Sequence, residues 1–178
     1  MSAFADRFVD HLQRLDRAAL AVLRRSLAHP LGSHAPAFPF VEAFVPGEHP
    51  DDARRRALYL AAGLYALNPR HRGGEPLGRA IAQQMRDRGS ESLEKRFIAL
   101  LGADAQSLPT LLRHAVQLLA ADERGFDFAA LLDDLSALLD ERPSERRDRV
   151  RQRWARDFYR VVAAPDASPD DGAEPAAA

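Results

Sequence analysis

The chain has 178 residues, 46% of them hydrophobic, which is enough to bury a core, so global disorder is not expected. Its formal net charge of −1 neither indicates nor excludes a nucleic-acid partner. The absence of Cys excludes disulfides, thiolate metal sites and cysteine nucleophiles, and with them a disulfide-stapled secreted module.

The first stretch of the chain is predicted to be helical. Apolar residues recur at intervals of three and four from Phe4 to Leu23, which predicts a helix over about 3–28. Pro30 and Gly32 end it, and the prolines and phenylalanines of 29–50 predict a long ordered loop with a short helix.

The rest of the chain also has a helical period. Helices are predicted from Asp51-Asp52 to Asn68, over 77–88, 90–101, 109–121 and 127–139, and after Pro143-Ser144. The tail from about residue 164 is rich in Ala, Asp and Pro and is predicted to be disordered. Because no alternating run is long enough to force a strand, we expect an all-α fold of about 7–8 helices.

The targeting and membrane signals are negative. Asp6, Arg7 and Asp10 within the first ten residues do not fit a signal peptide. No apolar run approaches the roughly 18–20 residues that span a bilayer. We therefore expect a cytoplasmic protein with no membrane partner.

Acidic and basic residues are unevenly distributed along the chain, although the net charge is close to zero. Residues 101–141 are mainly acidic and 142–160 mainly basic, and every basic residue except Lys95 is Arg. Codon bias in a GC-rich genome produces such a preference, and so does selection for bidentate phosphate contacts. The abundant Ala favours codon bias, so each arginine is judged by its position.

The last predicted helix carries two stripes. At about 100° per residue, one apolar stripe is formed by Val150, Trp154, Phe158 and Val161. A second stripe, roughly 130° around the helix, is formed by Arg146, Arg149, Arg153, Arg156 and Arg160. The apolar stripe can dock on a core while the arginines face a polyanion, although a solvated surface fits the pattern equally well.

Other cations lie on the predicted helices. Arg24-Arg25 come near the end of the first helix, where they also complement the helix dipole. Lys95-Arg96 precede Phe97, and Arg113 follows two leucines, so each is next to expected core. Arg54-Arg55-Arg56 must point in three directions, so at most two of them can join one patch. All these patterns also occur on ordinary amphipathic helices.

Signals for catalysis are weak. The six histidines include no pair at the spacing of His-Glu-x-x-His, and the loop histidines His29 and His34 are better explained as surface residues than as metal ligands. The neighbouring acids of Asp133-Asp134 point about 100° apart on a helix. There is no phosphate-loop motif and no nucleophile elbow. We therefore expect no catalytic residue, no cofactor and no metal.

Several short segments follow one another in a recognisable order along residues 4–160. They are Leu23-Arg24-Arg25, Pro36-Ala37-Phe38, Leu77-Gly78-Arg79-Ala80, Glu94-Lys95-Arg96-Phe97, Leu112-Arg113, Phe126-Asp127-Phe128 and Val150-Arg151-Gln152-Arg153-Trp154. In this order, and at this length, the chain resembles the CasB family, the small subunit of the type I-E CRISPR Cascade complex.

The resemblance implies two small helical bundles connected by a long loop region and no enzymatic activity. The corresponding division is an N-terminal helical region at 1–104, a C-terminal helical region at 105–163 and a disordered tail at 164–178. The implied partners are other Cascade subunits, a second copy packed head to tail with the first, the guide RNA and the displaced strand of the target DNA.

The family's basic surface holds the displaced strand, and its positions fall here on Arg24, Arg25, Arg96, Arg113 and Arg142. With Lys95 and part of the arginine stripe, the predicted nucleic-acid-binding residues are Arg24, Arg25, Lys95, Arg96, Arg113, Arg142, Arg146, Arg149 and Arg153. We therefore predict a non-catalytic nucleic-acid-binding subunit. The alternative is a helical protein–protein adaptor with solvated arginines, and a small helical enzyme is a third class without a supporting motif.

Overall fold

The structure is a computed structural model that describes residues 2–46, 52–142 and 144–164. These residues form nine α-helices and two short 3-10 helices, with no strand beyond one isolated bridge between His71 and Phe126. The predicted all-α fold class is confirmed. The predicted arrangement in two bundles stays a prediction.

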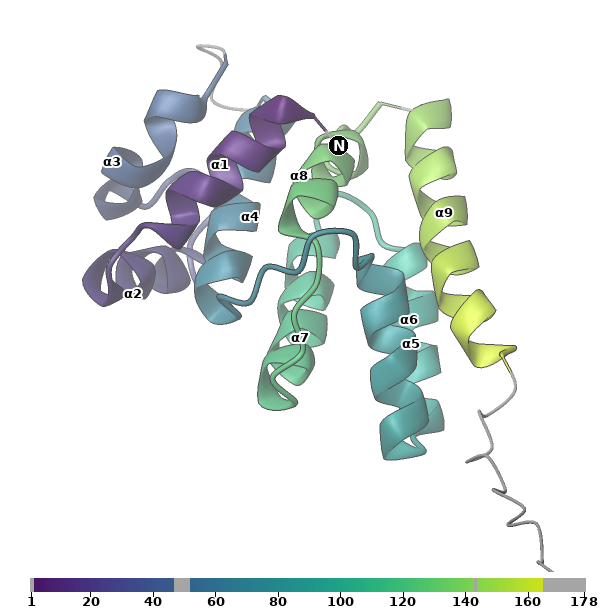
Figure 1. Ribbon diagram of the computed structural model, residues 1–178. Helices are drawn as coiled ribbons and strands as arrows, with labels where there is room; N and C mark the ends of the chain where they lie inside the picture. Colours follow the sequence, from purple (N-terminus) through teal and green to yellow (C-terminus); the bar gives the residue numbers. More distant parts are fainter. Residues whose placement is uncertain (1, 47–51, 143, 165–178) are drawn as a thin grey trace, which may run out of the picture.

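Figure 1 shows the helices in chain order from purple to yellow. Their bounds are α1 (Ala3–Gln13), α2 (Arg17–Ser26), η1 (Ala35–Ala37), α3 (Phe38–Val41), η2 (Glu42–Phe44), α4 (Ala53–Leu67), α5 (Leu77–Arg88), α6 (Glu91–Leu101), α7 (Leu108–Ala121), α8 (Phe128–Leu138) and α9 (Glu145–Val162).

The first predicted helix, over about 3–28, is wrong in one respect, because the structure has two helices there. α1 ends at Gln13, and α2 begins after Asp16, whose carboxylate accepts a hydrogen bond from the Ala19 N–H at 2.8 Å. This N-cap stabilises a new helix start. The apolar spacing runs on across the break from Leu12 to Ala19, so periodicity alone does not reveal it.

The later helices confirm the predicted ones to within a residue or two. Asp52, Asp127 and Ser144 cap α4, α8 and α9 by accepting backbone N–H bonds with their side chains. Gly89 closes α5 with a φ of +57°. The predicted ordered loop is described as far as residue 46 and holds η1, α3 and η2. Asp51, Pro143 and the tail from residue 165 lie outside the described residues.

A continuous hydrophobic core joins the described helices, with α4 at its centre. Every residue of α4 from Ala57 to Ala66 is buried, as expected for a helix covered on all sides. Figure 1 shows α4 between α2 and α8, while α8 also contacts α1 and α9 contacts α5. Helices from both predicted regions therefore pack on one another, and the division after residue 104 stays a prediction.

The apolar stripe of α9 docks as predicted. Val150, Trp154 and Phe158 are at most 4% exposed, and the Phe158 ring stacks on Phe97 of α6 with centroids 4.2 Å apart. On the α5 side, a Cβ atom at Gly78 would lie 2.6 Å from the Trp154 carbonyl oxygen, so only glycine permits this approach. The arginine stripe is consequently left facing outward.

Candidate nucleic-acid interface

Four hollows of the protein surface form a series in which each shares at least one lining residue with the next. The first, between α8 and α9, is lined by Arg146, Arg149 and Arg153. The second lies where α4 begins and α8 ends, and Arg54 and Arg142 line it together with Arg146. Arg146 therefore connects the first hollow to the second.

The third and fourth hollows continue the series over α7 to α6. The third hollow is lined by Arg56, Arg113 and His114, and Arg56 also lines the second. The fourth lies among α5, α6 and α7, and Arg96 and His114 line it. We call the four hollows together the basic groove; its arginines are Arg54, Arg56, Arg96, Arg113, Arg142, Arg146, Arg149 and Arg153.

At the α9 end of the basic groove, the guanidinium groups are bonded to acceptors of the protein itself. Arg153 pairs with Asp134 of α8, whose side chain is 10% exposed. Arg142 pairs with Asp140 at 3.0 Å, and this hydrogen bond lowers the pKa of the Asp140 carboxyl. The other two arginines are engaged as well, since Arg149 pairs with Glu145 at 3.8 Å and Arg146 donates to the Asp133 carbonyl at 3.1 Å.

Asp134 holds α9 to α8 from a buried position. Its carboxylate accepts hydrogen bonds from Arg153 and from the Trp154 Nε1–H, the latter at 2.7 Å. Burial raises the pKa of the Asp134 carboxyl, and the two hydrogen bonds oppose that effect without cancelling it. Because two consecutive residues of α9 bond to one carboxylate, the rotation of α9 about its axis is fixed at this point.

At the α6–α7 end of the basic groove, as far as the structure describes the chain, the arginines are not bonded in this way. Within the described residues, no acid or carbonyl group is bonded to the side chains of Arg96 or Arg113, and the same holds for Arg54 in the second hollow. Arg56 is an intermediate case, since it lies 3.6 Å from the exposed carboxylate of Glu141. An unpaired guanidinium keeps its planar set of donors available for a phosphate.

Comparison with known proteins places the chain among CRISPR-associated proteins. Residues 19–159 match the family model described as CRISPR-associated protein Cse2. The chain belongs to the Cse2 family. A curated Cse2 protein of Thermus thermophilus is 44% identical over 160 residues, which cover 86% of this chain and 89% of that protein.

Solved structures of Cse2-family proteins agree with this assignment. A Cse2-family protein of Thermus thermophilus matches with a TM-score of 0.75 at 44% identity, covering 89% of this chain and 99% of that one. CasB of M. ruber matches with a TM-score of 0.75 at 37% identity, covering 92% and 96%. A chain of a CRISPR RNA-guided surveillance complex matches at 0.74 and 26%, covering 89% and 93%. The resemblance to the CasB family is thus confirmed.

In this Cse2-family chain, the structure brings six of the nine predicted binding residues to the basic groove and leaves three outside it. Arg24 donates from Nε and Nη2 to the Ala66 carbonyl at 3.0 and 2.9 Å, which satisfies the C-terminal end of α4. Arg25 and Lys95 are exposed but line none of the four hollows. The binding roles of all nine stay predictions.

Some residues that line the groove are not among the nine predicted binding residues. Arg54 and Arg56 line it while Arg55 turns away to Glu42, at 2.5 Å, which agrees with the expectation that at most two of the three share a patch. The position of His114, shared by two hollows, has no sequence signal, because it depends on how α7 packs between α4 and α6.

A metal site and a membrane-spanning helix are two further features that would bear on the function of the Cse2-family chain. In its described part, no group of three or more His, Cys, Asp or Glu residues is placed to hold a metal ion. None of the helices of that part is both long and apolar enough to cross a membrane.

Proposed function

We propose that this chain is a non-catalytic, nucleic-acid-binding subunit of a type I-E CRISPR surveillance complex. In this proposal it stabilises the pairing of guide RNA with target by holding the displaced DNA strand in the basic groove. Membership of the Cse2 family and the likeness to a chain of a CRISPR RNA-guided surveillance complex support the assembly. The single observation that supports the binding role is the series of adjoining hollows from α9 to α6, whose lining holds eight arginines against five acids, Asp52, Asp133, Asp134, Asp140 and Glu141.

The energetics suit a subunit without chemistry of its own. Replacing a DNA duplex by an RNA–DNA hybrid is nearly balanced in free energy, so modest extra binding tips the exchange. A protein that binds only the displaced strand shifts the equilibrium by mass action. Since the displaced strand differs for every target, contacts to phosphates rather than base edges are the suitable kind.

The further partners in this proposal are the other Cascade subunits, the guide RNA and a second copy of the chain. A protein–protein adaptor is the second candidate, and one observation favours it. The arginines at the α9 end are bonded to protein acceptors, while Ile98, Tyr159 and Val162 expose more than a third of their large apolar side chains. An adaptor would dock through such side chains without contacting nucleic acid.

Salt dependence provides the first test. The isolated chain is expected to bind single-stranded DNA weakly and without sequence preference. If it neutralises about four phosphates, log K falls with log salt with a slope of about −3. Fluorescence anisotropy across a salt series measures this slope. A slope near zero contradicts phosphate binding and favours the adaptor.

The second test uses charge removal in the assembled complex. Arg25→Ala, Arg96→Ala and Arg113→Ala together are expected to preserve helical circular dichroism and assembly. Opening of target duplex should weaken because the displaced strand is held less firmly, and the deficit relative to the parent should shrink at high salt, which weakens the same charge contacts in the parent.

A matched control removes the same charge elsewhere. Arg7, Arg14 and Arg72 are exposed and line none of the four hollows, so their triple replacement by Ala should leave duplex opening unchanged. Normal opening of target by the Arg25, Arg96 and Arg113 variant would show that these side chains are solvated surface.

A further inference from the structure

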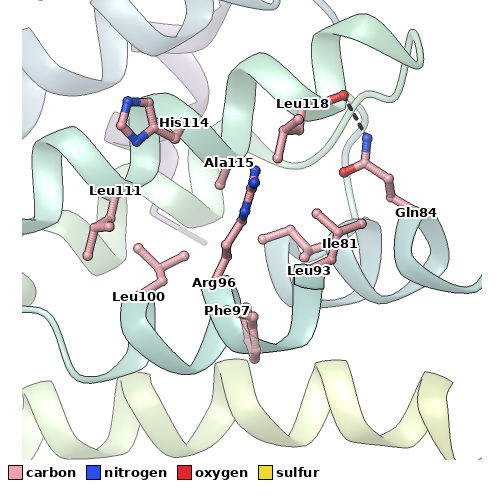
Figure 2. A pocket seen from close by; sticks show the side chains of 10 residues that line it. All are labelled: Ile81, Gln84, Leu93, Arg96, Phe97, Leu100, Leu111, His114, Ala115 and Leu118. Carbon is pink, nitrogen blue, oxygen red and sulfur yellow. Dashed lines mark hydrogen bonds between the residues drawn. The ribbon is translucent and has the colours of Figure 1, made fainter. Parts of the chain in front are cut away.

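The fourth hollow of the basic groove has an apolar interior. It is a cavity of about 380 Å³ among α5, α6 and α7, within the range of roughly 300–1,000 Å³ typical of small-molecule sites. Figure 2 shows the apolar side chains that line it, which are Ile81, Leu93, Phe97, Leu100, Leu111 and Leu118. Binding of phosphate alone does not need such walls.

One cationic side chain, that of Arg96, lies among the apolar lining of the cavity. In Figure 2 the Arg96 side chain extends from α6 towards Ala115 of α7, between the two helices, with His114 one residue away on α7. His114 also lines the third hollow, where Arg113 lies. A ligand in the cavity can therefore remain attached to an anionic chain that continues along Arg113.

The amide donor of Gln84, at the α5 side of the cavity, is already engaged. Gln84 Nε2 donates to the Leu118 carbonyl at 2.6 Å and to Asp122 at 2.5 Å. Asp122 in turn accepts from Arg88. With this donor engaged and most of the remaining lining apolar, the cavity selects a ligand mainly by its size and apolar faces.

We propose that this cavity receives one unpaired nucleobase of the strand whose phosphates bind Arg96 and Arg113. The inference rests on the proposed function and adds a base-binding site to it. A nucleotide in a single strand combines an apolar flat face with an adjacent anion, which matches apolar walls beside unpaired guanidinium groups. An apolar side chain of a partner protein would fill the walls but would leave Arg96 without a counter-charge.

The test compares two oligonucleotides of equal charge. One is single-stranded DNA of mixed sequence, and the other has the same backbone with abasic positions throughout. The full chain is expected to bind the ordinary strand about fivefold more tightly, the low end of measured base-stacking contributions. The salt slopes of the two strands should be equal, because both offer the same phosphates.

A cavity-filling variant identifies where the base goes. Ala115→Phe places a ring in the cavity, so the ordinary strand should lose its advantage while the affinity for the abasic strand stays unchanged. Gln117→Phe is the matched control, since Gln117 is exposed on the same helix and lines none of the four hollows. That control should retain the fivefold preference, and circular dichroism verifies that both variants fold.

Three outcomes overturn the inference in different ways. Equal affinity of the parent for both strands, with a normal salt slope, removes the base site and leaves the proposed function intact. Binding of neither strand overturns both proposals. If Ala115→Phe instead prevents assembly with other subunits while the preference for the ordinary strand persists, the cavity holds a protein side chain.

Discussion

The two ends of the basic groove contain the same residue type in different states. At the α9 end, Arg142 and Arg153 are paired with carboxylates, and Asp134 is buried beneath Arg153. At the α6–α7 end, Arg96 and Arg113 have no acid bonded to them within the described residues. A paired guanidinium has part of its charge offset and its donors occupied. A count of arginines therefore overstates the number of phosphate sites.

The largest effect is expected from breaking the core of the α9 end. Trp154→Ala should lower the free energy of unfolding by about 3–5 kcal/mol, because it leaves a cavity and removes one donor from the buried Asp134 carboxylate. Urea unfolding followed by circular dichroism measures this change. A loss below about 1 kcal/mol would mean that the indole contributes little to the core.

A crossed pair of single variants sharpens the comparison. Arg153→Ala should cost about 1–2 kcal/mol of stability, less than for a fully buried pair since half of Arg153 is exposed. Arg113→Ala should instead leave stability nearly unchanged and weaken binding of single-stranded DNA. Urea midpoints measure the stability of both variants, and anisotropy titrations measure their binding of single-stranded DNA. The comparison fails if the two variants behave alike.

Removing the two unpaired arginines of the α6–α7 end tests the binding contribution of that end by itself. Arg96→Ala with Arg113→Ala should weaken single-strand binding by about 1 kcal/mol, as expected for two charge contacts that are open to solvent in whole or in part. The salt slope should become shallower by about 1.4, since roughly 0.7 is lost per phosphate contact. Arg7→Ala with Arg14→Ala provides the control of equal charge, and an equal loss there would indicate a non-local charge effect.

A smaller effect is expected when a paired arginine is released. Asp140→Asn removes the carboxylate that holds Arg142, and it should strengthen single-strand binding by a few tenths of a kcal/mol. Asp104→Asn is a suitable control, because it removes the same charge and Asp104 bonds to Ser107 rather than to an arginine. Unchanged binding in Asp140→Asn would show that Arg142 does not reach the strand.

The smallest effect concerns pH. Burial raises the pKa of Asp134 above its ordinary value of 3.8, so the folded protein binds more protons than the unfolded chain between these two values. The contribution of this group to stability is therefore largest below pH 3.8 and declines as the pH rises through the folded pKa. The stability of the parent relative to Asp134→Asn should improve on acidification from about pH 7 to about pH 4, as measured by urea unfolding. A pH-independent difference would contradict the raised pKa.

Most of the fold could be predicted because its signals are local. Asp52, Asp127 and Gly89 start or end helices through contacts within a few residues of themselves. The break at Asp16 was missed because the apolar spacing continues through it. Local patterns therefore predict where helices can form better than where a long one divides.

The candidate site was predictable only in part. Arg96 and Arg113 were predicted from the resemblance to the CasB family, and each also adjoins a buried core residue, Phe97 or Leu112, which orients the helix. The pairing of Arg153 could not be predicted, because its partner Asp134 lies on a different helix and only packing brings the two together. The cavity beside Arg96 likewise depends on the spacing of three helices, which no segment of the sequence encodes alone.

Gly78 of α5 bears on which substitutions the arginine row of α9 can accept. Its missing side chain admits the Trp154 carbonyl, so α5 and α9 touch through their backbones at this level. Backbone contact at one level resists both sliding and rotation of α9, and a slip of one residue would turn its outward face by about 100°. The orientation of the arginine row is thus set on the opposite side of the helix as well as by the bond between Arg153 and Asp134. Substitutions at the other positions of the row can then change the affinity for a polyanion without moving the helix that carries it.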